Sequence, residues 1–121
     1  MKKWFNSAGY ALKGISSLLK SERNARIEFA AALLVVILSA WLSLSAIQWS
    51  CILFSIGAVL SAEAFNSAVE KLSDLYTREH HAGIGNIKDI SAGAVLIACI
   101  TSMVIGMIIL GPLLLKKFGI N

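Results

Sequence analysis

Two long stretches without a charged residue constrain the fold of this chain more than any other feature. No Asp, Glu, Lys or Arg occurs in residues 29–62, a run of 34 residues, or in residues 90–115, a run of 26. About 20 consecutive apolar residues are enough for a helix to cross the hydrocarbon core of a bilayer. A soluble helical bundle would need a charged face on each helix, and these stretches have none. The sequence therefore predicts an all-α membrane protein.

The length of the two runs predicts three transmembrane helices. The second run accounts for one helix over residues 90–115. The first run, with the residues that follow it, has room for two helices, expected over residues 29–44 and 47–69 with a break near Ser45. With 121 residues in all, the chain is expected to form a single membrane domain over residues 1–121.

The segment before the first run is predicted to be an amphipathic helix on the membrane surface, over residues 1–21. Its apolar side chains recur at helical spacing and lysines fill other positions. The aromatic residues Trp4, Phe5 and Tyr10 suit the headgroup layer. Ser21 is expected to be the N-cap of the next helix.

The distribution of basic residues predicts the orientation of the chain. Six of the eleven lie before the first predicted span, three lie between the second and the third, and the first link has none. The positive-inside rule therefore places the N-terminus and residues 71–89 on the cytoplasmic side of a bacterial cytoplasmic membrane. In a membrane protein, the net charge of +4 relates to orientation and to anionic lipid. No nucleic-acid-binding motif is present, so no nucleic-acid partner is expected.

A stripe of polar residues ends the second predicted span. At about 100° per residue, one helix face carries Glu63, Asn66, Ser67, Glu70 and Asp74. Such a stripe is costly at a membrane boundary unless it binds something. Phosphoryl transfer needs carboxylates that hold Mg²⁺, a cation for the phosphates, and a base or orienting group for the attacking hydroxyl. The stripe and the charged segments beside it contain all of these groups.

The positions of these residues along the chain indicate a role for each. Glu22, Glu70 and Asp74 can hold a metal ion, and Lys88, with Arg23 or Arg26, can meet phosphates. Glu63 lies deepest in the membrane, which favours it as the base for a hydroxyl at the headgroup level.

The residues alone leave two other functions open. Membrane carboxylates also serve proton-coupled transport, so a small proton-coupled exporter is an alternative to an enzyme of phosphoryl transfer. A non-catalytic membrane subunit is the other alternative. The adjacent His80 and His81 lack a third ligand nearby in the sequence, so no metal site is expected there.

Several motifs follow one another in a fixed order: Ala8-Gly9-Tyr10 with Lys13-Gly14, Glu22 with Arg26 and Glu28, Glu63-x-x-Asn66-Ser67-Ala68-Val69-Glu70-x-x-x-Asp74, Lys88-Asp89, and Ala92-Gly93-Ala94-Val95-Leu96. In these motifs the sequence resembles the prokaryotic diacylglycerol kinase family of small three-span lipid kinases, and the resemblance covers nearly the whole chain.

The resemblance implies a homotrimer with active sites at the cytoplasmic boundary between subunits. It implies ATP as phosphate donor, Mg²⁺ as cofactor, and a membrane lipid alcohol as acceptor, either diacylglycerol or undecaprenol. By matching position, Glu63 is the general base and Glu22 and Glu70 are the metal carboxylates. The nucleotide- and phosphate-binding residues carried over are Asn66, Lys88, Asp89, Tyr10 and Arg26, and the further site residues are Asp74 and Glu28.

Departures from the family pattern leave the lipid open. The branch that phosphorylates diacylglycerol has Ser-Trp where this chain has Ala11-Leu12, and Ser where it has Ala92. The pattern Glu22-Arg23-Asn24-x-Arg26 is more similar to the Gram-positive branch, which prefers undecaprenol.

Overall fold

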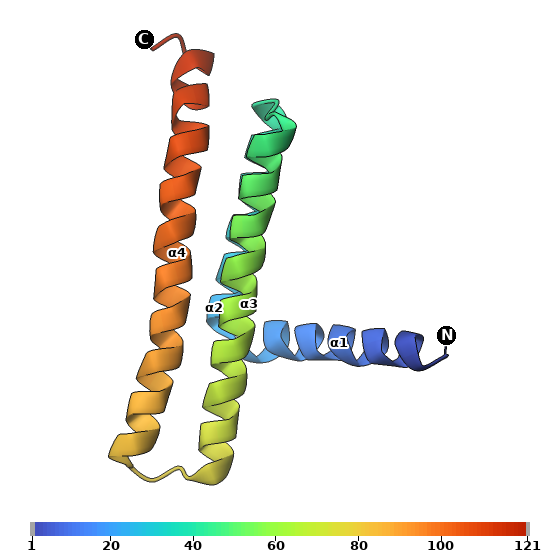
Figure 1. The fold of residues 1–121 in the computed structure, drawn as a ribbon, viewed down its shortest axis with the longest axis vertical. Helices are drawn as coiled ribbons and strands as arrows, with labels where there is room; N and C mark the ends of the chain where they lie inside the picture. The colour runs from blue at the N-terminus through green and yellow to red at the C-terminus, as the bar shows by residue number, and fades with distance from the viewer. Residues whose placement is uncertain (1, 121) are drawn as a thin grey trace.

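The computed structural model describes residues 2–120, and the side chains of residues 6–120. It consists of four helices, α1 (Lys2–Ser21), α2 (Arg23–Trp41), α3 (Ala46–Tyr76) and α4 (Ala82–Lys117). Figure 1 shows α1 projecting crosswise from α2, α3 and α4, which run lengthwise together. This arrangement confirms the predicted fold class, a surface helix followed by three long apolar helices. The side chains of Trp4 and Phe5 lie outside the described residues.

The helices α2, α3 and α4 are each long and apolar enough to cross a membrane. At a rise of about 1.5 Å per residue, the 31 residues of α3 and the 36 of α4 form helices about 46 and about 54 Å long, against about 30 Å for the hydrocarbon core. α3 continues past Val69 to Tyr76, and α4 begins at Ala82, before Ile90. The end of the α3–α4 hairpin that holds residues 77–81 therefore has enough length to extend beyond the hydrocarbon layer.

Large apolar side chains cover the outside of the helices, including Leu33, Phe54, Phe65, Ile97 and Met107. In water such a surface would be unfavourable, but lipid tails are as apolar as these side chains. The exposed apolar surface agrees with the three candidate spans.

The turn between α2 and α3 is packed from inside by leucines. Leu42 and Leu44 are buried against Ile52 and Leu110, which brings the turn onto α4. Ser43 between them has a positive φ of 56°, an uncommon conformation for a residue other than glycine. Holding Ser43 in this conformation lets both leucines point inward.

A capping box begins α3 directly after this turn. The Gln48 backbone N–H donates to Ser45 Oγ at 3.3 Å, and the Ser45 backbone N–H donates to Gln48 Oε1 at 2.9 Å. Two backbone donors that the helix leaves unpaired are thereby satisfied.

The corner between α1 and α2 differs from the prediction. Ser21 is the last residue of α1, and Glu22 is the N-cap of α2 in an extended conformation. The expectation that Ser21 caps α2 was wrong because the Glu22 backbone N–H still donates to the Leu18 carbonyl at 2.9 Å, which continues α1 through Ser21. Arg26 Nη1 donates to the Leu19 and Lys20 carbonyls at 3.0 and 3.2 Å, and so places its charge on the C-terminal end of α1.

The capping box predicts the stability of the α2–α3 turn. Ser45→Ala removes the side chain that accepts from Gln48, and we expect the free energy of unfolding to fall by about 1 kcal/mol. The measurement is equilibrium unfolding by SDS in mixed micelles.

Ser50→Ala is the matched control on the same helix. Among the described residues, its hydroxyl donates to the Ala46 carbonyl, an acceptor in the preceding turn. We expect a change of less than about 0.5 kcal/mol, as is usual for surface substitutions. Equal losses in the two variants would contradict a specific role for the capping box.

Candidate active site

The predicted polar face of α3 is buried between the helices. Glu63 is 3% exposed, Asn66 9% and Ser67 3%. Glu70, one turn after Asn66, is half-buried, and Asp74 is exposed. The polar face therefore runs from the buried middle of α3 to its exposed end.

A serine of α4 fixes the amide of Asn66. Ser91 Oγ donates to Asn66 Oδ1 at 2.6 Å, and Ser91 Oγ also lies 3.0 Å from the Lys88 carbonyl oxygen. With Oδ1 occupied by Ser91, the amide nitrogen of Asn66 faces Glu70, and Nδ2 donates to Glu70 Oε1 at 3.5 Å. Ser91, Asn66 and Glu70 thus form a short hydrogen-bonded chain from α4 to α3.

Ser91 was not among the site residues expected from the sequence. Its spacing of three residues from Lys88 places both on one face of a helix, and this was the one available signal. The contact itself depends on how α4 is rotated against α3.

The predicted phosphate-binding lysine also meets the polar face. Lys88 Nζ pairs with Asp74 Oδ1 at 3.0 Å, near the end of the α3–α4 hairpin where residues 77–81 join the two helices. Asp89 is exposed at the next position of α4. The structure therefore brings Lys88 to the stripe that ends in Asp74.

Three glutamates lie within electrostatic range of Glu63, one each from α2, α3 and the α1–α2 corner. The charges of Glu70 and Glu22 both act on the carboxyl group of Glu63, and the charge of Glu63 acts on Glu28. Like charges at such range repel one another, and a cation placed among them relieves the repulsion.

The donor set fits a magnesium ion that is also held by phosphates. Among the described side chains, no three His, Cys, Asp or Glu converge as a complete metal site. Mg²⁺ is usually bound through one or two carboxylates together with substrate phosphates and water, so a site for this ion does not require three protein ligands. His81 has another task, because its Nδ1 accepts from the Ile84 backbone N–H at 3.3 Å and caps α4.

An apolar groove of about 350 Å³ lies between α2, α3 and α4, beside the glutamates. Its lining is almost entirely apolar and includes Ala32, Val35, Val59, Leu60, Met103 and Gly106. Its polar lining residues are Ser55, Ser102 and Glu28, and the Oε2 atom of Glu28 is buried without a hydrogen-bond partner in the described chain. The apolar groove thus reaches Glu28, one of the four glutamates.

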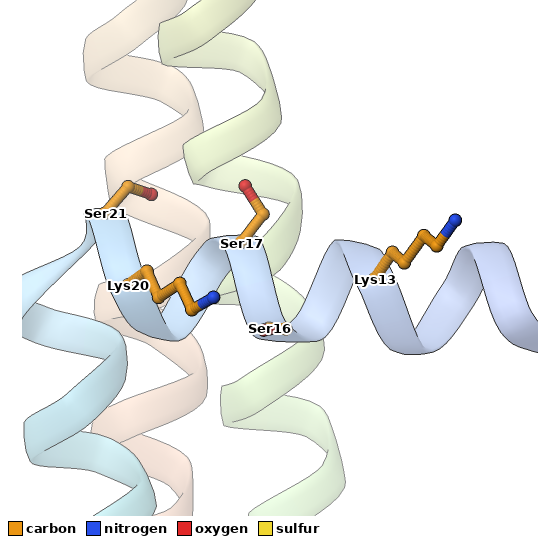
Figure 2. A pocket seen from close by; sticks show the side chains of 5 residues that line it. All are labelled: Lys13, Ser16, Ser17, Lys20 and Ser21. Carbon is orange, nitrogen blue, oxygen red and sulfur yellow. The ribbon is translucent and has the colours of Figure 1, made fainter.

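The polar side of α1 holds a second, shallow hollow of about 500 Å³, lined by Lys13, Ser16, Ser17, Lys20 and Ser21. Figure 2 shows Ser17 and Ser21 projecting from the same side of this helix. Tyr10 lies further out and is 70% exposed, with Lys13 Nζ 5.7 Å from its ring centroid. Figure 1 shows that α1, which carries Tyr10, points away from α2, α3 and α4.

Comparison with known proteins decides between a kinase and the other two functions. Residues 9–110 match the family described as prokaryotic diacylglycerol kinase. The chain belongs to the prokaryotic diacylglycerol kinase family. It is a lipid kinase, which confirms the predicted resemblance and displaces the exporter and the non-catalytic subunit.

Curated relatives cover most of the chain. An undecaprenol kinase of Bacillus subtilis (strain 168) is 37% identical over 93% of this chain and 91% of its own length. A diacylglycerol kinase of Escherichia coli (strain K12) is 36% identical over 86% of this chain and 85% of its own. A diacylglycerol kinase of Haemophilus influenzae is 34% identical over 86% of this chain and 89% of its own.

The contact between Ser91 and Asn66 predicts an effect on catalysis. Ser91→Ala removes the donor that fixes the Asn66 amide, and we expect the rate of lipid phosphorylation to fall by about tenfold, because small misplacements of site groups are costly. The measurement is the initial rate in mixed micelles.

Thr101→Ala provides the control for the loss of a hydroxyl from α4. Thr101 is exposed and is not part of the lining of the apolar groove. We expect this variant to keep its activity within twofold. A Ser91→Ala variant as active as Thr101→Ala would show that Asn66 needs no fixed amide.

Proposed function

We propose that this kinase transfers the terminal phosphate of ATP to the hydroxyl group of a membrane lipid alcohol at the cytoplasmic face of the membrane. The observation that carries the proposal is the apolar groove that ends at Glu28, beside Glu63 and the buried polar face of α3. A lipid alcohol has the matching chemistry, a hydrocarbon chain for the groove and a hydroxyl for the carboxylates.

The proposed transfer step uses Glu63 as the base. As the lipid hydroxyl oxygen bonds to the terminal phosphorus, Glu63 accepts the hydroxyl proton. The bond from that phosphorus to the bridging oxygen breaks, and ADP leaves with the electron pair. The buried position of Glu63 excludes water that would compete with the lipid hydroxyl.

Other residues bind and orient the two substrates. Asn66, held by Ser91, is oriented toward Glu70, and its amide can hydrogen-bond to a phosphate oxygen. Lys88 carries a positive charge for the phosphates, with Asp89, Tyr10 and Arg26 as the further nucleotide-binding residues that the family resemblance implies. The interaction of Arg26 with the end of α1 supports an additional structural role for that residue.

Glu22 and Glu70 are the proposed ligands of Mg²⁺, with Asp74 as a further candidate. The metal ion supplies positive charge to the phosphate oxygens when it is bound. The repulsion that Glu22 and Glu70 each exert on Glu63 supports a cation in this position.

Of the two candidate lipids, undecaprenol is favoured over diacylglycerol. The chain aligns with the undecaprenol kinase of B. subtilis over 93% of its length, against 86% for the diacylglycerol kinase of E. coli. The pattern Glu22-Arg23-Asn24-x-Arg26 points to the same branch.

The proposal includes a homotrimer with its active sites on the cytoplasmic side. The bias of basic residues toward α1 and residues 71–89 supports this orientation. The glutamates form no complete metal site among the described residues, and Tyr10 is exposed on α1, the helix that points away from α2, α3 and α4 (Figure 1). Both observations support an active site that a neighbouring subunit completes.

The proposed base predicts the effect of Glu63→Gln. We expect the phosphorylation rate to fall by about a hundredfold or more, since general base catalysis contributes at least that much. The measurement is phosphate transfer from labelled ATP in mixed micelles with Mg²⁺, with undecaprenol and diacylglycerol offered separately. Glu79→Gln, which neutralises an exposed acid in the α3–α4 link, is the control and should keep its activity.

The same assay tests the lipid. Transfer to undecaprenol at the higher kcat/KM supports the favoured substrate, and a higher value for diacylglycerol overturns that choice. A folded protein that phosphorylates neither lipid would refute the proposed substrates, and full activity of Glu63→Gln would refute the proposed base.

The groove predicts a separate effect on lipid binding. Ala32→Leu places a larger side chain in the groove, and we expect the KM for the lipid to rise by about tenfold, the effect of overfilling a packed apolar site. The KM for ATP should not change. Ala30→Leu, two positions away on the exposed side of α2, is the control, and equal effects of the two variants would argue against the groove as the lipid site.

A further inference from the structure

Lys71 of α3 connects to the corner between α1 and α2, where Glu22 lies. Its ammonium nitrogen donates to Ser21 Oγ at 2.8 Å and lies 3.6 Å from Glu22 Oε1. Ser21 Oγ in turn donates to Glu22 Oε1 at 3.1 Å. The three side chains form a closed triangle between residues that are 50 positions apart in the sequence.

The local backbone does not hold the Glu22 carboxylate. A residue at an N-cap usually accepts a hydrogen bond from the first turn of its own helix. Glu22 is the N-cap of α2, yet its side chain makes no such bond and turns toward Ser21 and Lys71 instead. In the described chain, Lys71 is therefore the cation paired with this carboxylate.

Glu22 is also one of the two proposed metal ligands, so a divalent ion and Lys71 interact with the same carboxylate. We propose that Lys71 is the resident counterion of Glu22 and competes with the metal ion for this carboxylate, so that Lys71 raises the metal concentration that the enzyme requires. The inference rests on the proposed function, in which Glu22 holds the metal.

Removing Lys71 has two opposing effects on metal binding, and their relative sizes decide whether the affinity for the metal ion rises or falls. By orienting Glu22, Lys71 makes only a small favourable contribution to metal binding. Both side chains are partly exposed, at 48% and 27%, and ion pairs of this kind are weak. The repulsion between a lysine and a doubly charged ion a few ångströms away is larger, and after screening it corresponds to about three- to tenfold in affinity. Removing the charge is therefore expected to tighten metal binding.

The experiment measures binding of Mn²⁺ alone to the purified full-length protein in micelles, by the loss of the electron paramagnetic resonance signal of free Mn²⁺. In Lys71→Met and in Lys71→Gln, we expect the Kd for Mn²⁺ to fall by about three- to tenfold. Lys71→Arg keeps the charge and should stay within twofold of the natural protein. The Mg²⁺ concentration for half-maximal phosphate transfer should change in parallel.

Arg78→Met is the matched control for the loss of one positive charge. Arg78 is exposed in the link between α3 and α4, and its substitution should leave the Kd for Mn²⁺ within twofold. Thermal unfolding of each variant in the same micelles verifies that the protein is folded, and two neutral variants keep the test valid if one of them is unstable.

Glu22→Gln separates failure of this inference from failure of the proposed function. Weaker Mn²⁺ binding in Glu22→Gln, with unchanged or weaker binding in both neutral Lys71 variants, would overturn the competition and leave Glu22 as a metal ligand. Unchanged binding in Glu22→Gln would overturn the metal role of Glu22 and the inference with it. Tighter binding in the neutral Lys71 variants that disappears in the Glu22→Gln background supports the inference.

Discussion

The polar face of α3 is the constraint on which the rest of the structure depends. A carboxyl group, an amide and a hydroxyl are buried on a helix that also carries enough apolar residues to cross a membrane. Burying such groups is unfavourable unless each has a partner, and lipid tails provide none. The helices α2 and α4 must therefore cover this face, and Ser91 supplies the hydrogen bond that Asn66 needs.

The rest of α3 allows this arrangement because its inward-facing residues change from apolar to polar along the length of the helix. Toward the α2–α3 turn, its inward residues are apolar and pack with Leu42, Leu44 and Leu110. Toward Tyr76 they become polar and then charged, and there α3 and α4 are long enough to extend past the hydrocarbon layer. The apolar groove extends from Leu110 in the first region to Glu28, so a lipid chain and polar substrates can approach the same carboxylates from different sides.

The sequence predicted the features that depend on a single helix. The charge-free runs predicted three long apolar helices, and a helical period was enough to place Glu63, Asn66 and Ser67 on one buried face. Contacts between helices were harder to predict, because they depend on how the helices are rotated and on the shape of the corner. Ser91 and Lys71 were missed for this reason, and the expected cap at Ser21 was wrong because Ser21 is still part of α1 and Glu22 takes the N-cap position of α2.

The pairing of lysines with carboxylates differs along the polar face, and the difference follows from burial. Lys88 with Asp74 and Lys71 with Glu22 both lie where water still reaches the side chains. Glu63 and Glu28 lie deeper, and a long lysine side chain that reached them would bury its ammonium group at high cost. A neutral hydroxyl can enter that region at a lower cost than a cation. The carboxylates that water reaches can therefore exchange one cation for another, whereas the deeper carboxylates are suited to a lipid alcohol.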